Sequence, residues 1–287
     1  MIRLILVTLL LSSLPVFGMP PLSKVRFHNM ETDTARITKM LIDAEKINEP
    51  SERIVYIADQ FVDLPYVAST LENPGGEELL TVNLDELDCT TFVETVIALA
   101  MTAGEHRTSW RDFLVTLEKL RYRSGEMIGY PSRLHYFSDW VVDNVHRGNV
   151  TEITGDLPDH RDQTKSIDFM TRNAEKYPAL ADSSNLTELK NYERGYRNHR
   201  YYYLPWNKIN DKHNRDKLRN GDIVAFITKT PGLDVTHQGL IIKDEKGVPY
   251  MLHASMSEGK VLLNKEPLLE QLRKGRIPGV RIVRMNE

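Results

Sequence analysis

The spacing of hydrophobic positions divides the chain into two parts. From about residue 31 to residue 196, apolar residues recur at the intervals of amphipathic helices, as in SERIVYIADQFVDL, SWRDFLVTLEKLRYRSG, HYFSDWVVDNVHRG and SIDFMTRNAEKYP. From about residue 200, short apolar runs bounded by turn residues predict strands, namely YYYLPW, GDIVAFIT, THQGLIIKDEKG, PYMLHAS, GKVLLN and GVRIVRM. Helices first and antiparallel strands second favour an α+β fold over an alternating parallel-sheet fold.

One turn in the second part has a consequence for chemistry. The tetrapeptide DEKG separates two of the predicted strands and is typical of a hairpin. We therefore expect the strand that carries His237 to lie beside the strand that carries His253.

The first eighteen residues have the pattern of a secretory signal. Arg3 precedes an apolar run over residues 4–11, Pro15 breaks the run, and Val16 and Gly18 suit a signal-peptidase site. The run is too short to cross a bilayer, and no second long apolar stretch follows. The pattern predicts a signal peptide over residues 1–18 and an exported protein, periplasmic or extracellular, that leaves the membrane after cleavage; an uncleaved anchor is the alternative.

Composition narrows the partners and the domain organisation. Without Arg3 the chain carries 36 basic against 40 acidic residues, which gives no basic field for nucleic acid or an anionic membrane. Its 41% hydrophobic content is ordinary for a globular core, and residues 19–287 are enough for a single domain. Its single cysteine allows no internal disulfide. The pattern does not predict the oligomeric state.

That cysteine, Cys89, lies where a helical pattern begins, in LDELDCTTFVETVIALA. Asp88 is a good N-cap, and Thr91 with Glu94 has the spacing of a capping box, so either residue is a candidate for the cap. In the first turn of a helix, free backbone N–H groups and the helix dipole stabilise a thiolate and lower its pKa. The alternative is a buried cysteine that acts as a small hydrophobic residue.

A nucleophilic cysteine needs a base and a group that orients the base. His237 lies at the start of one predicted strand, with Gly239 leaving room on the same face, and His253 lies on the next strand. Taken alone, each histidine is better explained as a satisfied core or strand-edge residue. The order of a helical cysteine, a strand histidine and a polar residue on the neighbouring strand is more informative.

These segments resemble the NlpC-type, papain-like hydrolases of bacterial cell walls. The resemblance rests on LDCTTFVE, GDIVAF, THQGLII and YMLHAS in that order, and covers roughly residues 61–103 and 215–284. It implies a papain-like α+β fold with Cys89 as nucleophile, His237 as base and His253 as the orienting residue. LPYVAS resembles the Pro-Tyr stretch of that family, which implies that Tyr66 places a hydroxyl near the oxyanion; the segment TLENPGGEELLTVNLDEL departs from the usual short connection.

A helical insertion over about residues 104–214 makes the chain similar to the N-acetylmuramoyl-L-alanine amidase branch of that superfamily. The segment SRLHYFSDW in the insertion is a candidate binding wall, because arginine binds carboxylates and aromatic rings present flat faces to sugars. The substrate-binding candidates are Asp88, Ser132, Arg133 and Tyr136, and core packing is the alternative for the aromatic residue.

The resemblance implies a thiol amidohydrolase that cleaves the amide between the lactyl group of N-acetylmuramic acid and L-alanine, on soluble muropeptides. No cofactor or metal is expected, because no His-Glu-x-x-His pattern or second thiol occurs. A γ-D-glutamyl-diamino acid endopeptidase would use the same residues. A thiol acyltransferase and a non-catalytic wall-binding module are further alternatives.

Overall fold

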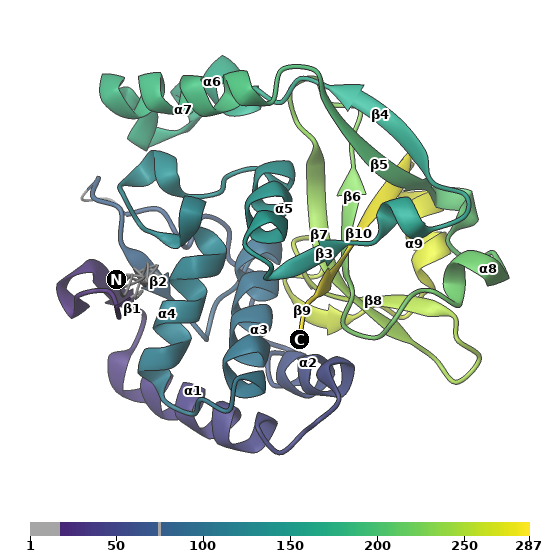
Figure 1. Cartoon of the computed structure of the whole chain (residues 1–287), viewed down its shortest axis with the longest axis horizontal. Helices are drawn as coiled ribbons and strands as arrows, with labels where there is room; N and C mark the ends of the chain where they lie inside the picture. Colours follow the sequence, from purple (N-terminus) through teal and green to yellow (C-terminus); the bar gives the residue numbers. More distant parts are fainter. Residues whose placement is uncertain (1–17, 74–75) are drawn as a thin grey trace, which may run out of the picture.

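A computed structural model describes residues 18–73 and 76–287, so residues 1–17 of the predicted signal peptide lie outside the described residues. The α-helices of the described part are α1 (Met30–Ala44), α2 (Pro50–Asp59), α3 (Cys89–Gly104), α4 (Trp110–Arg121), α5 (Phe137–His146), α6 (Phe169–Arg172), α7 (Ser183–Gly195), α8 (Lys212–Arg215) and α9 (Leu268–Lys274). Helix α3 packs against α1, α2 and α4 and also against two strands of the main sheet. Figure 1 shows these helices beside the sheet, with α6 and α7 projecting above.

The main sheet is antiparallel, with strand order β4-β5-β10-β6-β7-β8-β9 and β3 paired to β10. Its strands are β3 (Val150–Glu152), β4 (Arg161–Lys165), β5 (His199–Pro205), β6 (Ile223–Ile227), β7 (Val235–Lys243), β8 (Pro249–Ser255), β9 (Lys260–Leu263) and β10 (Gly279–Met285). The DEKG hairpin is confirmed, because β7 and β8 pair from Leu240↔Leu252 to Lys243↔Pro249. The mixed helix and sheet architecture agrees with the predicted α+β class.

The helical part of the chain contains strands that the periodicity did not predict. β1 (Val25–Phe27) and β2 (Leu80–Val82) form a parallel pair, and β3 and β4 join the main sheet from within the insertion. β4 consists of five polar residues and pairs with β5 at the end of the sheet. A polar edge strand gives no alternating apolar signal, so its partner β5 decides its conformation. The insertion is therefore not entirely helical.

Helix α3 occupies the centre of the largest hydrophobic core. Its predicted apolar residues, including Phe92, Val96 and Ile97, are fully buried, and so are Ala98 and Leu99 on its other side. A helix that is apolar around most of its circumference is stable only when neighbours cover it on several sides. The sheet and three helices cover α3, and this packing fixes the position of its first residue, Cys89, against the sheet.

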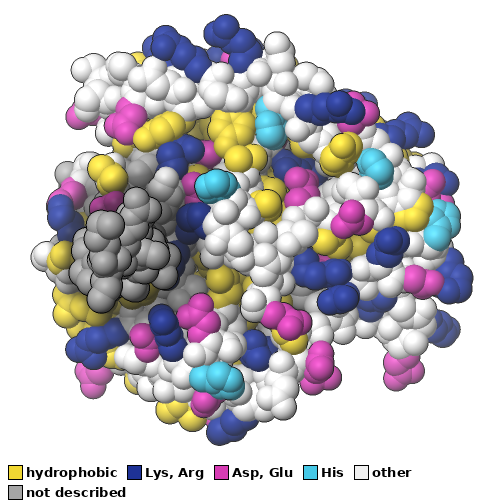
Figure 2. All heavy atoms as spheres, viewed as in Figure 1, with side chains coloured by type: hydrophobic (Ala, Val, Ile, Leu, Met, Phe, Trp, Pro, Cys, Tyr) yellow, Lys and Arg dark blue, Asp and Glu magenta, His cyan; other side chains and the backbone are white. Residues whose placement is uncertain are grey.

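The described residues contain no helix long and apolar enough to cross a membrane. Figure 2 shows basic and acidic side chains interspersed on the face in view.

Candidate active site

The first turn of α3 is held by a capping box that begins at Asp88. Its carboxylate accepts hydrogen bonds from the backbone N–H groups of Thr90 and Thr91 at 3.0 and 2.8 Å, and the Thr91 hydroxyl accepts from the Asp88 N–H at 2.9 Å. Asp88 is therefore the N-cap, as one of the two alternatives predicted. The second alternative, a Thr91–Glu94 box, is wrong, because Glu94 pairs with Arg121 instead. Cys89 follows as the first helical residue.

Two donors from other residues act on the thiol of Cys89. One is the backbone N–H of Gln238 on β7, and the other is the hydroxyl of Thr90. The Gln238 side chain also donates to the Thr90 hydroxyl, with Nε2 and Oγ1 2.9 Å apart. Thr90 and Gln238 thus bridge the start of α3 to β7, and the bridge places Cys89 beside the residue that follows His237.

The predicted lowering of the thiol pKa is wrong for this structure. Burial raises the pKa of Cys89 to about 11, and the Asp88 carboxylate adds to the increase. The hydrogen bonds from Gln238, Thr90 and the Cys89 backbone act in the opposite direction but are weaker. Position at a helix start is visible in the sequence, whereas burial beneath a sheet is not. The resting thiol of Cys89 is therefore neutral at neutral pH.

His237 and His253 come together as the hairpin predicted. Nε2 of His237 lies 2.6 Å from Nδ1 of His253, and the two rings meet edge to face at 4.8 Å. Gly239 permits this approach, because a Cβ atom at this position would lie 2.7 Å from the Cβ of His253 and from the carbonyl oxygen of Leu252. The predicted role of Gly239 in leaving room is confirmed.

Both imidazoles are neutral in the folded protein. Burial lowers the pKa of His237 to about 3, with His253 adding to the decrease, and burial lowers the pKa of His253 to about 4. Each neutral ring carries one N–H proton, and one of these two protons lies in the hydrogen bond between the rings. If His237 donates through Nε2, its Nδ1 has a free lone pair that can accept a proton.

The described side chains of Cys89 and His237 form no direct hydrogen bond, although Gln238 joins their surroundings. Catalytic hydrogen bonds are often long or poorly aligned without substrate and shorten when substrate binds. The roles of Cys89, His237 and His253 therefore stay predictions.

Tyr66 lies close to the cysteine. Burial raises the pKa of its hydroxyl, and interactions with Cys89 and Asp88 add to the increase. Two backbone contacts fix the segment, since the Tyr66 N–H donates to Gly259 and Tyr66 forms a bridge with Leu87 just before the helix. The long segment between Tyr66 and Cys89 thus leaves the hydroxyl near the thiol, and its oxyanion role stays a prediction.

The predicted substrate-binding residues have partners inside the protein. The Ser132 hydroxyl donates to the Gly129 carbonyl and accepts from the Ile128 N–H. Arg133 is 6% exposed and forms ion pairs with two protein carboxylates, those of Glu72 and Glu78. The carboxylates that Arg133 binds are therefore the protein's own, and the sequence pattern could not distinguish these from a substrate carboxylate.

Tyr136 is buried, and its hydroxyl donates to Glu193 at 2.7 Å and accepts from the Met170 N–H at 2.6 Å. These contacts attach α6 and α7 to the segment before α5. The Tyr136 ring therefore packs in the protein interior, which was the alternative prediction for this residue. The Asp88 carboxylate is also engaged within the protein, because it accepts the hydrogen bonds of the helix cap.

Comparison with known proteins places the chain in a family. A family model described as "AmiA-like: N-acetylmuramoyl-L-alanine amidase-like" matches residues 56–280. The chain belongs to the AmiA-like family. A crystal structure of an N-acetylmuramoyl-L-alanine amidase from Bacteroides uniformis is 35% identical to this AmiA-like chain, with a TM-score of 0.76, and covers 83% of this chain and 99% of that one.

Two further solved structures are similar to this AmiA-like chain. A Bacteroides fragilis protein named as a proposed xylanase is 38% identical, with a TM-score of 0.73. The match covers 80% of this chain and 99% of the Bacteroides fragilis chain. A Legionella pneumophila protein shares the fold at 22% identity, with a TM-score of 0.71, and covers 90% of this chain and 96% of its own. A comparison with curated proteins gave no significant match.

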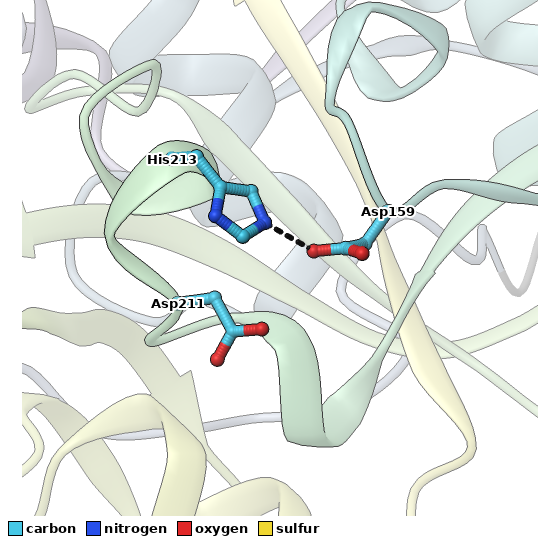
Figure 3. A group of neighbouring side chains, drawn as sticks. All are labelled: Asp159, Asp211 and His213. Carbon is cyan, nitrogen blue, oxygen red and sulfur yellow. Dashed lines mark hydrogen bonds and ion pairs between the residues drawn. The ribbon is translucent and has the colours of Figure 1, made fainter.

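A second group of polar side chains lies away from Cys89. Asp159, Asp211 and His213 have ligand atoms within 4.8 Å of one another, and His213 Nε2 contacts Asp159 at 2.5 Å (Figure 3). Lys208 already pairs with Asp211 at 2.8 Å and lies 3.9 Å from Asp159. With this lysine as counter-charge, the group joins α8 to the loop before β4.

Thr90 and Gln238 were missed by the sequence analysis, although each directly follows a predicted catalytic residue. We expect Thr90→Val to raise the thiol pKa further and to slow iodoacetamide alkylation of Cys89 at pH 8 by about tenfold, because a hydrogen bond to a charged group contributes about 1.5 kcal/mol or more. Thr90→Ser keeps the hydroxyl and should react like the wild type. Equal alkylation rates for Thr90→Val and the wild type would show that the hydroxyl does not stabilise the thiolate.

Proposed function

We propose that the protein is a cysteine-dependent, metal-independent amidase that cleaves the amide between the lactyl group of N-acetylmuramic acid and the L-alanine of the stem peptide. The contact between the Cys89 sulfur and the Gln238 N–H carries the proposal, because it holds the thiol next to the His237–His253 pair. The family description and the amidase name of the Bacteroides uniformis relative favour this bond over others. The order of helix-start cysteine and two strand histidines supports a papain-like fold.

The proposed reaction begins from neutral groups. As the sulfur attacks the amide carbonyl, its proton passes to Nδ1 of His237, while Nε2–H of His237 remains donated to Nδ1 of His253. The Cys89 N–H and the Tyr66 hydroxyl stabilise the oxyanion. His237 then protonates the leaving amine of L-alanine, which leaves a thioester between Cys89 and the lactyl carbonyl. Water, deprotonated by the same imidazole, hydrolyses the thioester.

A xylanase would need a different site. Glycoside hydrolases use two carboxyl groups on either side of the scissile bond, one of which donates a proton. Two carboxylates close to Cys89 in the sequence do not suit this role, because Asp88 caps α3 and Glu94 is paired with Arg121. These two residues are therefore not available as the carboxyl pair of a glycosidase.

The test is a digest of N-acetylmuramoyl tripeptide, analysed by mass spectrometry, with xylan as a parallel substrate. The proposal predicts free N-acetylmuramic acid and a tripeptide that begins with L-alanine. Release of the diamino acid alone would support the endopeptidase alternative, and sugar products from xylan would support a glycosidase. We also propose that the protein is exported and that soluble muropeptides are its preferred substrate. Faster cleavage of intact sacculi would overturn that preference.

The low histidine pKa values predict activity in mild acid. A base is competent only when unprotonated, so a His237 pKa of about 3 and a His253 pKa of about 4 keep both rings competent above about pH 5. We expect kcat/KM to change by less than about threefold between pH 8 and 5, whereas a base with the ordinary histidine pKa of about 6.5 would lose about 30-fold. The profile of kcat/KM is measured on muramyl tripeptide, and circular dichroism at each pH checks that the protein is folded. An acid limb near pH 6.5 in folded protein would contradict the assignment.

A further inference from the structure

A small cavity lies beside the candidate nucleophile, between the start of α3, β7 and the segment that leads into α5. Its volume is about 30 Å³. Thr90 and Gln238 form one wall, and these two residues also contact the Cys89 sulfur. The opposite wall comes from the segment Leu134–Trp140, which the sequence analysis singled out as a binding wall.

The cavity suits a small apolar group. Val93, Leu134, Phe137 and Trp140 contribute hydrocarbon surface. Glu94 also lines the cavity, but its carboxylate is engaged by Arg121. The cavity volume exceeds the roughly 10–15 Å³ that a cavity needs to hold one water-sized probe. The cavity therefore accommodates a methyl-sized group.

We propose that this cavity is a specificity subsite for a methyl group on the carbon next to the scissile amide. A carbonyl carbon must come within about 3–3.5 Å of the sulfur to react, so a substituent one carbon away lies against the residues that surround the sulfur. The inference rests on the proposed function, whose substrate carries such a methyl on each side of the bond. One belongs to the lactyl group and the other to L-alanine, and substrate analogues distinguish them.

The experiment compares the native muramyl tripeptide with two analogues that each lack one methyl group. A glycolyl group replaces the lactyl group in one analogue, and glycine replaces L-alanine in the other. Loss of the methyl that occupies the cavity should lower kcat/KM by about 10- to 100-fold, the usual effect of one methylene in a hydrophobic pocket. Loss of the other methyl should have a much smaller effect.

Val93 provides the matched variants. It is 1% exposed and lines the cavity, whereas Val96 is buried on the same helix outside the cavity wall. Val93→Ile should fill the cavity and lower the preference for the native substrate over the sensitive analogue by about tenfold. Val93→Ala should enlarge it and improve cleavage of an analogue with ethyl in place of the recognised methyl. Val96→Ile should leave both ratios unchanged.

The inference and the proposed function fail differently. If the wild type cleaves the native substrate and both analogues within threefold of one another, or if folded Val93→Ile keeps the wild-type preference, the subsite is overturned while the amidase proposal stands. If folded wild type does not cleave the native substrate, the proposed function is overturned and the subsite with it.

Discussion

Replacing Cys89 with alanine should lower kcat for amide cleavage by about 10³-fold or more, because removal of a covalent nucleophile removes the reaction path itself. The fold should persist, since the Asp88–Thr91 capping box that begins α3 does not use the thiol. The rate is measured on muramyl tripeptide, and circular dichroism confirms that the variant is folded.

The single cysteine offers a matched control. Iodoacetamide should inactivate the wild type in proportion to one alkyl group bound, and the alanine variant should bind none. Because the thiol pKa is raised to about 11, alkylation should accelerate steadily from pH 7 to pH 10. Activity of Cys89→Ala within tenfold of the wild type would rule out Cys89 as the nucleophile.

Replacing Arg121 with alanine should lower the free energy of unfolding by about 3–5 kcal/mol, the usual cost of breaking a buried ion pair. Arg121 is 1% exposed and donates to Glu94 and to the Thr81 carbonyl, at 2.7 Å in each case. It therefore joins β2 and α3 to its own helix, α4. Its loss would leave Glu94 buried without a cation, and burial already raises the pKa of that carboxyl.

Urea unfolding measures this effect, and a double variant controls for it. Arg121→Met with Glu94→Leu removes both charges and keeps apolar volume, so it should recover most of the lost stability. A decrease below about 1 kcal/mol for Arg121→Ala would show that the pair does not hold these elements together.

Local rules predicted the elements that carry the candidate site. The strands after residue 200 follow from short apolar runs between turns, and the cap at Asp88 follows from residue type. The hairpin then brings His237 to His253, because its turn fixes which strands pair. These features depend on neighbours a few residues apart, which a sequence displays directly.

Features that depend on distant contacts were not predictable in this way. The predicted decrease of the thiol pKa was wrong, because an argument from the local helix dipole cannot include burial by a sheet whose strands come more than a hundred residues later. Arg133 and Tyr136 suited a sugar-binding wall by residue type, yet their partners are Glu72, Glu78 and Glu193. The same segment still lies near Cys89, because Leu134 and Trp140 line a cavity together with Thr90, the residue after the cysteine.

The most direct test of the central claim is the mass of a trapped acyl-enzyme. Muramyl tripeptide is mixed with the protein, the reaction is stopped in acid within milliseconds to seconds, and the intact and peptide masses are recorded. The account predicts an adduct on Cys89 equal to the N-acetylmuramoyl acyl group, without alanine or glutamate. An adduct that contains both amino acids would move the cleaved bond to the endopeptidase position, and fast product release with no adduct on Cys89 would contradict the proposed nucleophile.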